Sequence, residues 1–399
     1  MNNKPIILIF PFNLMSHYLR CLTLADQLKL HYDVRFATSP AYAKFIVGAG
    51  YATFPFTDFD LIEILRQSQE FRFDWLEENA LEQQFEQQKA IIHKHRPVAV
   101  IGDNSFSLKM AAEACDVKFI ALMNAYMTQC YEPGRKLTRT HPKARLMERL
   151  PTSLYWYIIR KIEKYHFNHI HTPFKKIRAK QGLKPIENYA KELEGDITLL
   201  CDLPSLFPQK NLPKCYHFIG PLLFSPSAKC DMPNWDIPKN QKKTILVSMG
   251  SSGDYAQIEW LNDKTFSAYN IIVTGDKKGI LKGDHILHYN FIPLHEVMPQ
   301  VNLLICHGGN GTIYEAIRAG VPVLCSPSIF EQEWNEYAII KNQLGDTLSD
   351  VNSPIELLRK INLWENKKQD ASFQKVIEKI QTFKLETPLN KLLTDTVFQ

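Results

Sequence analysis

Residues 306–327 combine a histidine, a glycine-rich turn and the expected start of a helix. The segment reads CHGGNGTIYEAIRAGVPVLCSP, with an apolar strand pattern that ends at His307 and a helix that begins near Gly311. Glycine lets the backbone approach a ligand closely, and the free N–H groups and dipole of a helix start favour phosphate. The spacing therefore predicts a diphosphate-binding loop.

Two common phosphate-binding motifs do not fit this loop. A dinucleotide-binding loop has the order GxGxxG, preferably with an acidic residue about 20 positions later, whereas GGNGT follows His307 here. A Walker loop requires GK followed by Ser or Thr, and this segment lacks that sequence. A glycine-rich turn can also be a plain connection, so the surrounding residues must decide its role.

A second candidate pair lies in the first half of the chain. His17 follows the apolar pattern IILIFPF, and Asp103 ends the pattern VAVIGD. Ligands of open α/β sheets bind at the carboxyl ends of strands, and a histidine titrates close enough to neutral pH to act as a general base. A lone histidine after a strand is more often structural, so a catalytic role for His17 requires a carboxylate partner such as Asp103.

Strand and helix patterns alternate in both halves, which predicts two doubly wound α/β domains with parallel sheets. The chain has 399 residues, enough for two such domains. Four prolines in an aperiodic stretch indicate a linker. We predict a first domain over 1–219, a linker over 220–243, a second domain over 244–372 and a helix over 373–399 that can pack back on the first domain.

The bulk composition excludes several classes of protein. Apolar residues make up 45% and charged residues 22% of the chain, as in globular enzymes and unlike disordered chains. The net charge of +5 is too small to indicate nucleic acid, and no run reaches the roughly 18 apolar residues of a membrane span. The eight scattered cysteines indicate free thiols in a reducing compartment, so we expect a cytoplasmic protein. Its possible association with a membrane depends on residues 131–184.

Residues 131–184 stand apart by their charge. They contain fourteen Lys and Arg against three Glu, a net +11, around the cluster LYWYII. One interpretation is a membrane-binding surface, and the other is a solvated basic helix whose aromatic residues pack inward.

The segment from His307 resembles the donor signature of the family 1 glycosyltransferases, the UDP-glycosyltransferase superfamily, in the order HGGxGTxxEAxxxGVPxxxxP. The resemblance implies a GT-B fold, with two Rossmann-like domains facing across a cleft. It also implies that the second domain binds a UDP-sugar, a co-substrate, through the residues His307, Gly309, Asn310, Gly311, Thr312 (diphosphate), Glu315 (ribose), Glu331 and Gln332 (sugar), Phe291 and Ile292 (base), and Ser251 and Ser252 (phosphates). Glu331 replaces the aspartate of the family, which leaves the identity of the sugar open.

The same resemblance covers the first domain. It implies that His17 is the catalytic base and that Asp103 holds its imidazole. Two departures are Ser16, where the family has glycine, and a longer loop before the histidine. Arg20 gives the start SHYLR, similar to the GHxxR of bacterial nucleotide-sugar enzymes that include hydrolases.

We expect no metal and no cofactor. His166, His169 and His171 have metal-like spacing without a nearby carboxylate or thiolate ligand in sequence, and Asp58 with Asp60 forms a DxD that is common by chance. The expected function is inverting transfer of a sugar from a UDP-sugar to a hydroxyl of a small hydrophobic or lipid acceptor. The alternatives are hydrolysis of the nucleotide sugar and an inactive nucleotide-sugar-binding protein.

Overall fold

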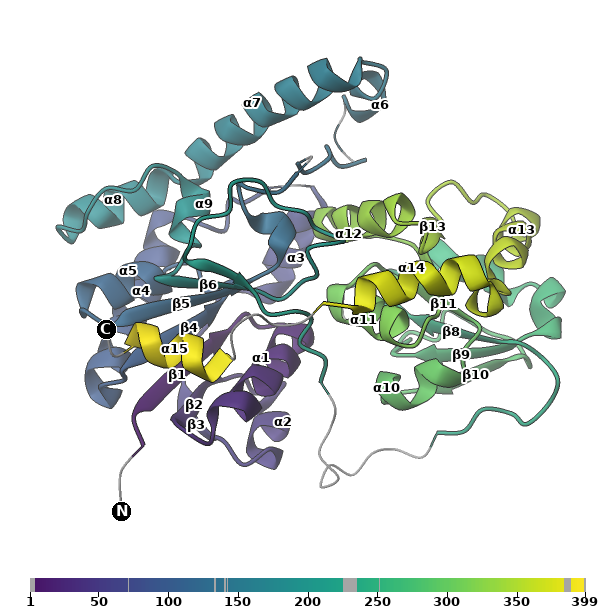
Figure 1. Ribbon diagram of the computed structural model, residues 1–399, viewed down its shortest axis with the longest axis horizontal. Helices are drawn as coiled ribbons and strands as arrows, with labels where there is room; N and C mark the ends of the chain where they lie inside the picture. Colours follow the sequence, from purple (N-terminus) through teal and green to yellow (C-terminus); the bar gives the residue numbers. More distant parts are fainter. Residues whose placement is uncertain are drawn as a thin grey trace. The chain divides into compact units, whose positions relative to one another are not determined.

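The computed structural model describes residues 4–70, 72–132, 134–139, 141, 143–224, 235–250, 252–383 and 389–397. The chain forms two compact units, Met1–Phe224 with Lys384–Gln399 and Ser225–Phe383 (Figure 1). Each unit contains one parallel sheet with flanking helices. The predicted α/β class with two doubly wound domains is confirmed.

The first unit contains a seven-stranded sheet in the order β3-β2-β1-β4-β5-β6-β7, parallel throughout. The strand order changes direction between β1 and β4, and the gap above such a switch point is where open α/β sheets bind ligands. The strands are β1 (Ile6–Pro11), β2 (Asp33–Thr38), β3 (Ala52–Pro55), β4 (Ala99–Asp103), β5 (Lys118–Met123), β6 (Ile197–Leu200) and β7 (Tyr216–Phe218).

Amphipathic helices cover this sheet. The first of them turns Leu24, Ala25 and Leu28 into the same core as Ile7 and Ile9 of β1. The helices of the first unit are α1 (Met15–Leu28), α2 (Ala43–Gly48), α3 (Leu61–Gln69), α4 (Glu78–His95), α5 (Leu108–Ala114), η1 (Ala125–Met127), α6 (Ala144–Met147), α7 (Thr152–Ile170), α8 (Thr172–Lys180), α9 (Tyr189–Glu192) and α15 (Leu389–Val397).

The second unit contains a six-stranded parallel sheet in the order β10-β9-β8-β11-β12-β13, with its switch point between β8 and β11. The strands are β8 (Thr244–Ser248), β9 (Asn270–Thr274), β10 (Ile286–Tyr289), β11 (Leu303–Cys306), β12 (Val323–Cys325) and β13 (Gly345–Thr347). The helices are η2 (Tyr255–Asn262), η3 (Lys264–Ala268), α10 (Leu294–Val297), η4 (Met298–Gln300), α11 (Asn310–Arg318), α12 (Phe330–Lys341), α13 (Pro354–Trp364), η5 (Lys367–Gln369) and α14 (Ala371–Gln381).

The end of the chain differs from the single helix predicted over 373–399. It forms α14, which packs against α11 in the second unit, and α15, which belongs to the first unit. Leu389 and Leu393 of α15 are buried in the core of the first unit, and the hydroxyl oxygens of Tyr32 and Thr394 lie 3.2 Å apart. The apolar residues of the segment 373–399 are therefore divided between the two units.

Two further observations bear on the sequence predictions. Seven of the eight cysteines lie in the described part of the chain, and all seven are free. Among the described residues, no helix is both long and apolar enough to span a bilayer.

Candidate active site

His17 and Asp103 meet at the switch point of the first sheet. Asp103 ends β4 opposite Pro11 of β1, and its carbonyl oxygen accepts a hydrogen bond from Phe12 N at 2.9 Å. His17 lies in the first turn of α1, because this helix begins at Met15. His17 Nδ1 is 2.9 Å from Asp103 Oδ1. The structure thus brings together the two side chains expected on the acceptor side.

Arg20 joins this pair and changes its electrostatics. Its Nε lies 2.5 Å from Asp103 Oδ2, its Nη2 bonds to Oδ1 of the same carboxylate, and Nη2 is also 3.0 Å from His17 Nδ1. All three side chains are buried. Burial alone raises the pKa of the Asp103 carboxyl, but the positive charge of Arg20, with a further contribution from His17, outweighs it and lowers that pKa to about 2.

Asp103 and Arg20 both contact Nδ1 of His17 and influence which ring nitrogen carries the proton. A charge-assisted hydrogen bond from Nδ1–H to Asp103 Oδ1 favours the tautomer with the proton on Nδ1. Arg20 Nη2, which can only donate and lies 3.0 Å from the same nitrogen, favours the tautomer with the proton on Nε2. When the proton is on Nδ1, the lone pair of Nε2 is available to take up a proton. The arrangement has the geometry of a base with an orienting carboxylate.

Sequence reasoning did not assign a role in this site to Arg20 or find Asn124 and Asp202. Arg20 Nη1 donates to Asn124 Oδ1 at 2.9 Å, and Asn124 Nδ2 donates in turn to Asp202 Oδ2 at 3.3 Å. The spacing could have revealed Arg20, because residues three apart on a helix share a face. Asn124 and Asp202 follow β5 and β6, so only the sheet order brings them near.

Aromatic side chains extend from His17 within the first unit. The imidazole lies edge-on to Phe12 with ring centroids 5.4 Å apart, and Phe12 lies 6.1 Å from Phe106. Phe106 is 5.0 Å from Trp75, which is 5.2 Å from Phe59. These edge-on contacts form a continuous apolar cluster next to the candidate base.

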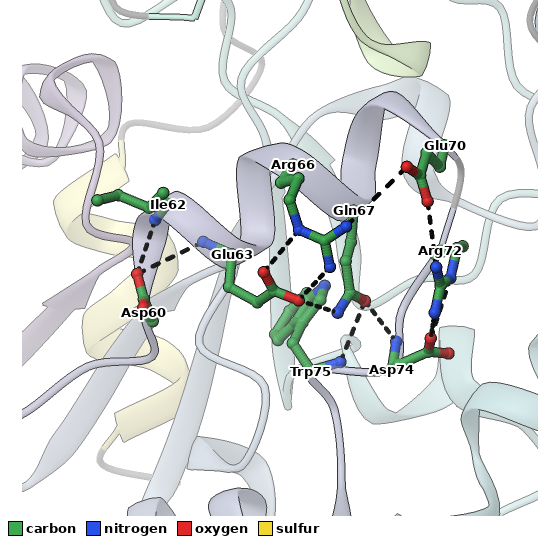
Figure 2. Close-up of polar contacts among 9 residues, drawn as sticks. All are labelled: Asp60, Ile62, Glu63, Arg66, Gln67, Glu70, Arg72, Asp74 and Trp75. Carbon is green, nitrogen blue, oxygen red and sulfur yellow. Dashed lines mark hydrogen bonds and ion pairs between the residues drawn. The ribbon is translucent and has the colours of Figure 1, made fainter.

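Hydrogen bonds of the Gln67 side chain hold the segment that carries Trp75 against α3 (Figure 2). Gln67 Oε1 accepts hydrogen bonds from Asp74 N at 2.8 Å and Trp75 N at 3.3 Å, and Gln67 Nε2 donates to Glu63 Oε1 at 2.6 Å. Gln67 is buried, so its amide satisfies backbone groups that would otherwise lack partners. These hydrogen bonds hold Trp75, at one end of the aromatic cluster, in place.

The two aspartates of the DxD pattern have structural partners. Asp58 Oδ1 accepts from Gln84 Nε2 and Phe59 N, each at 2.8 Å. Asp60 is the N-cap of α3 and accepts from Ile62 N at 2.9 Å. Among the described residues, no group of three His, Cys, Asp or Glu side chains is placed to hold a metal ion.

The glycine-rich loop of the second unit encloses His307 at the other switch point. His307 follows β11, and a Cβ on Gly250 or Gly309 would lie only 2.5 Å from its imidazole. Gly308 has a φ of +87°, which favours glycine. Burial lowers the pKa of His307 to about 4, so its imidazole is neutral at pH 7.

The start of α11 presents backbone N–H groups. Gly309 is the N-cap of the helix, and no side chain caps the backbone N–H groups of its first turn. Asn310 and Thr312 are half-buried and Gly311 is exposed. A helix start of this kind attracts an anion through its N–H groups and its dipole.

Gln332 and Ser252 are in contact, whereas Ser251 lies outside the described residues. Gln332 Nε2 donates to Ser252 Oγ at 2.9 Å, and its Oε1 accepts from Ser328 N at 2.8 Å. Asn335, which sequence reasoning missed, donates from Nδ2 to the carbonyl oxygen of Gly308 at 2.9 Å. The first turns of α12 therefore support both the serine loop and the glycine-rich loop.

The remaining predicted donor residues lie on the same unit. Glu315 of α11 is buried, its Oε2 is 2.5 Å from Arg318 Nη2, and burial raises its pKa. Glu331 is half-buried in the first turn of α12. Phe291, half-buried, and Ile292, buried, follow β10. Because all six strands are parallel, the segment with Phe291 leaves the same edge of the sheet as the glycine-rich loop.

Known proteins resemble this chain in sequence. Residues 235–386 match the glycosyltransferase family 28 C-terminal domain. A PGL/p-HBAD biosynthesis glycosyltransferase of Mycobacterium tuberculosis is 26% identical over 339 residues, which are 83% of this chain and 77% of the relative. A PGL/p-HBAD biosynthesis rhamnosyltransferase of Mycobacterium bovis is 24% identical over 83% of this chain and 74% of its own length. One shorter match, 28% identical over 60% of this chain, is an inactive PGL/p-HBAD biosynthesis glycosyltransferase.

Solved structures resemble the fold over the whole chain. Spinosyn forosaminyltransferase SpnP has a TM-score of 0.71 at 15% identity, with 100% of both chains covered. Glycosyltransferase VinC in complex with DTDP has a TM-score of 0.63 at 19% identity, with 98% of both chains covered. The match of residues 235–386 to a glycosyltransferase domain, the curated relatives and the shared fold together support a glycosyltransferase with the GT-B architecture.

Proposed function

We propose that the protein transfers a sugar, with inversion, from a UDP-sugar to a hydroxyl group of a hydrophobic acceptor. His17 Nε2 takes the proton from the hydroxyl as its oxygen attacks the anomeric carbon and the bond to the diphosphate breaks. The observation that carries the proposal is the 2.9 Å contact between His17 Nδ1 and an Asp103 carboxylate kept ionised by Arg20. This contact favours the tautomer of a base and stabilises the imidazolium that forms.

The second unit is proposed to bind the donor at the start of α11. The leaving diphosphate gains negative charge, and the N–H groups of residues 310–312 offer a preorganised positive end without a metal ion. His307 is neutral at pH 7, so it can donate one N–H to a phosphate oxygen. We propose that Glu315 binds the ribose, Glu331 with Gln332 binds the sugar, and Phe291 stacks on the base. For the sugar contact, Gln332 must exchange its bond to Ser252 for one to the sugar.

The acceptor is proposed to be a small hydrophobic molecule or a lipid. The aromatic cluster of Phe12, Phe59, Trp75 and Phe106 lies next to His17, so an apolar acceptor would replace water there. The names of the curated relatives place them in PGL/p-HBAD biosynthesis, and a spinosyn rhamnosyltransferase has been solved with its spinosyn aglycone.

A thermal-shift panel of UDP, dTDP and GDP, each with its common sugar conjugates and without metal, tests the donor site first. A ligand that binds only the folded protein raises its melting temperature by mass action. We expect stabilisation by UDP and one UDP-sugar. Stabilisation by dTDP, the ligand of the VinC complex, in place of UDP would change the proposed nucleotide from a uridine to a thymidine diphosphate. No response to any nucleotide would contradict the donor site.

The variant His17→Ala tests the base. Sugar transfer should be lost while the thermal shift with the donor remains, because His17 lies in the first unit and the proposed donor site in the second. His93→Ala, which removes an exposed histidine of α4, is the matched control and should keep full activity. Unchanged turnover of His17→Ala would reject the assignment. Release of free sugar without any acceptor would identify hydrolysis, and donor binding without either reaction would identify a binding protein.

A further inference from the structure

Helix α7 presents large apolar side chains to solvent. It runs for 19 residues, of which Tyr155, Ile159 and Ile170 are buried. The exposed fractions are 43% for Leu154, 61% for Tyr157 and 70% for Tyr165. Exposed apolar side chains that gather on one helix commonly mark a surface that binds another protein or a membrane.

Basic side chains lie among these apolar residues. Lys161 and Lys164 are exposed one helical turn apart, and the ammonium nitrogen of Lys161 lies 5.5 Å from the ring centroid of Tyr157. Arg160 is also exposed and is 3.4 Å from Glu132. The long stems of lysine can lie along an apolar surface while the charged ends reach a polar layer.

The charge of this region is opposite to that of the remaining chain. Residues 131–184 carry a net +11, whereas all other residues together carry a net −6, which leaves the total of +5. Lys176, Lys180 and Arg178 pair with carboxylates outside the segment, on Glu78, Glu82, Glu113 and Glu192. Lys161 and Lys164 of α7 are exposed, and exposed positive charge favours an anionic partner.

The buried side of α7 has its own small core. Tyr155 and Ile159 pack with Met147 of α6 in a cluster separate from the core under the sheet. Leu146, the neighbour of Met147, is 65% exposed. Helix α6 lies next to one end of α7 (Figure 1), so the exposed Leu146 adds an apolar side chain near that end.

We propose that the exposed face of α6 and α7 binds the surface of an anionic lipid bilayer. Tyrosine rings prefer the depth of the lipid headgroups, apolar side chains beside them enter the edge of the acyl layer, and lysines pair with anionic headgroups. Each basic residue near such a surface strengthens binding about fivefold. A nucleic acid fits less well, because Leu146, Leu154 and the tyrosines would remain in water or against phosphate.

Sedimentation of the full-length protein with vesicles tests this surface without donor or acceptor, so its result is independent of the proposed transfer. Vesicles of phosphatidylcholine with one third phosphatidylglycerol should bind the protein at low salt, whereas pure phosphatidylcholine should bind it at least tenfold more weakly. Binding should weaken as salt rises, because exposed charges are screened. Equal binding to both vesicles, binding to neither, or tighter binding to an oligonucleotide would overturn the proposal.

Paired variants locate the surface. Lys161→Glu with Lys164→Glu should weaken binding to anionic vesicles by about 25-fold or more, since two attractive charges are lost and two repulsive ones are gained. The control reverses Lys375 and Lys379, two exposed lysines one turn apart on α14, and should bind as the unchanged protein does.

A second pair tests the apolar contacts. Tyr157→Ser with Tyr165→Ser should weaken binding several-fold and leave the salt dependence intact. The control changes the exposed Ile355 and Leu363 of α13 to serine. Circular dichroism checks that every variant is folded. If the α13 or α14 variants lose binding as strongly as those of α7, the site is not on α7.

Discussion

The contact between Arg20 and Asp103 should couple the candidate active site to the stability of the first unit. Both side chains are buried, and two nitrogens of Arg20 bond to the two oxygens of Asp103. Asp103→Asn keeps the shape but leaves a buried guanidinium without its counter-charge. Removing one partner of a buried ion pair costs about 3 to 5 kcal/mol, so we expect the free energy of unfolding of the first unit to fall by that amount at pH 7.

The double variant gives the sharper test. With Arg20→Met added to Asp103→Asn, neither charge is buried alone, so the double variant should be more stable than the sum of the two single losses by about 2 kcal/mol. Urea unfolding measures the losses, and hydrogen exchange of the β4 peptide assigns them to the first unit. A coupling below about 0.5 kcal/mol would refute a tightly paired site.

The pH dependence gives an independent check of the same pair. The pKa of Asp103 is about 2 in the folded protein against an ordinary value of 3.8, a difference worth about 2 kcal/mol. Because the folded pKa is lowered, this stability is present above about pH 4 and is lost as the pH falls towards 2. The stability difference between the unchanged protein and Asp103→Asn should therefore shrink over that window. A difference that stays constant would contradict the lowered pKa.

Two further predictions concern the second unit. The pKa of His307 is about 4 in the folded protein, against 6.5 for an exposed histidine, so the unfolded state binds a proton first as the pH falls. The second unit should therefore lose about 3 kcal/mol of stability between pH 6.5 and pH 4. Urea unfolding of His307→Gln should lack this loss, and a pH profile identical to that of the unchanged protein would contradict the lowered pKa. Gly309→Ala would place a Cβ 2.5 Å from His307 Nε2, so the loop would have to move. The donor should then no longer raise the melting temperature. An unchanged rise in melting temperature would argue against this loop as the donor site.

The two sheets and most of the candidate site could be predicted from sequence. Apolar runs such as TILVSMG and NLLICHGG became β8 and β11, and the loop after β11 starts a helix as expected. His17 and Asp103 were paired on a family resemblance, and the parallel register of β1 with β4 explains why they meet. Local patterns predicted these features because each depends on strand ends and on residues close to them in sequence.

Features that depend on distant contacts were not predicted. Asn124 reaches Arg20 only because β5 lies next to β4, and Asn335 reaches Gly308 across the fold of the second unit. The pattern from Phe373 to Val397 correctly indicated helix, but Pro388 is a signal against a single continuous one. An amphipathic pattern shows that one face is buried and does not show which core receives it.

Helix α15 has a consequence for the order in which the protein is made. Leu389 and Leu393 complete the core of the first unit, yet the ribosome adds them only after the whole of Ser225–Phe383. At about 5–20 residues per second, the wait between Phe224 and Leu393 is on the order of 10 to 30 s. During that time the apolar surface that α15 later covers is open to chaperones, and the second unit can fold before the first is finished.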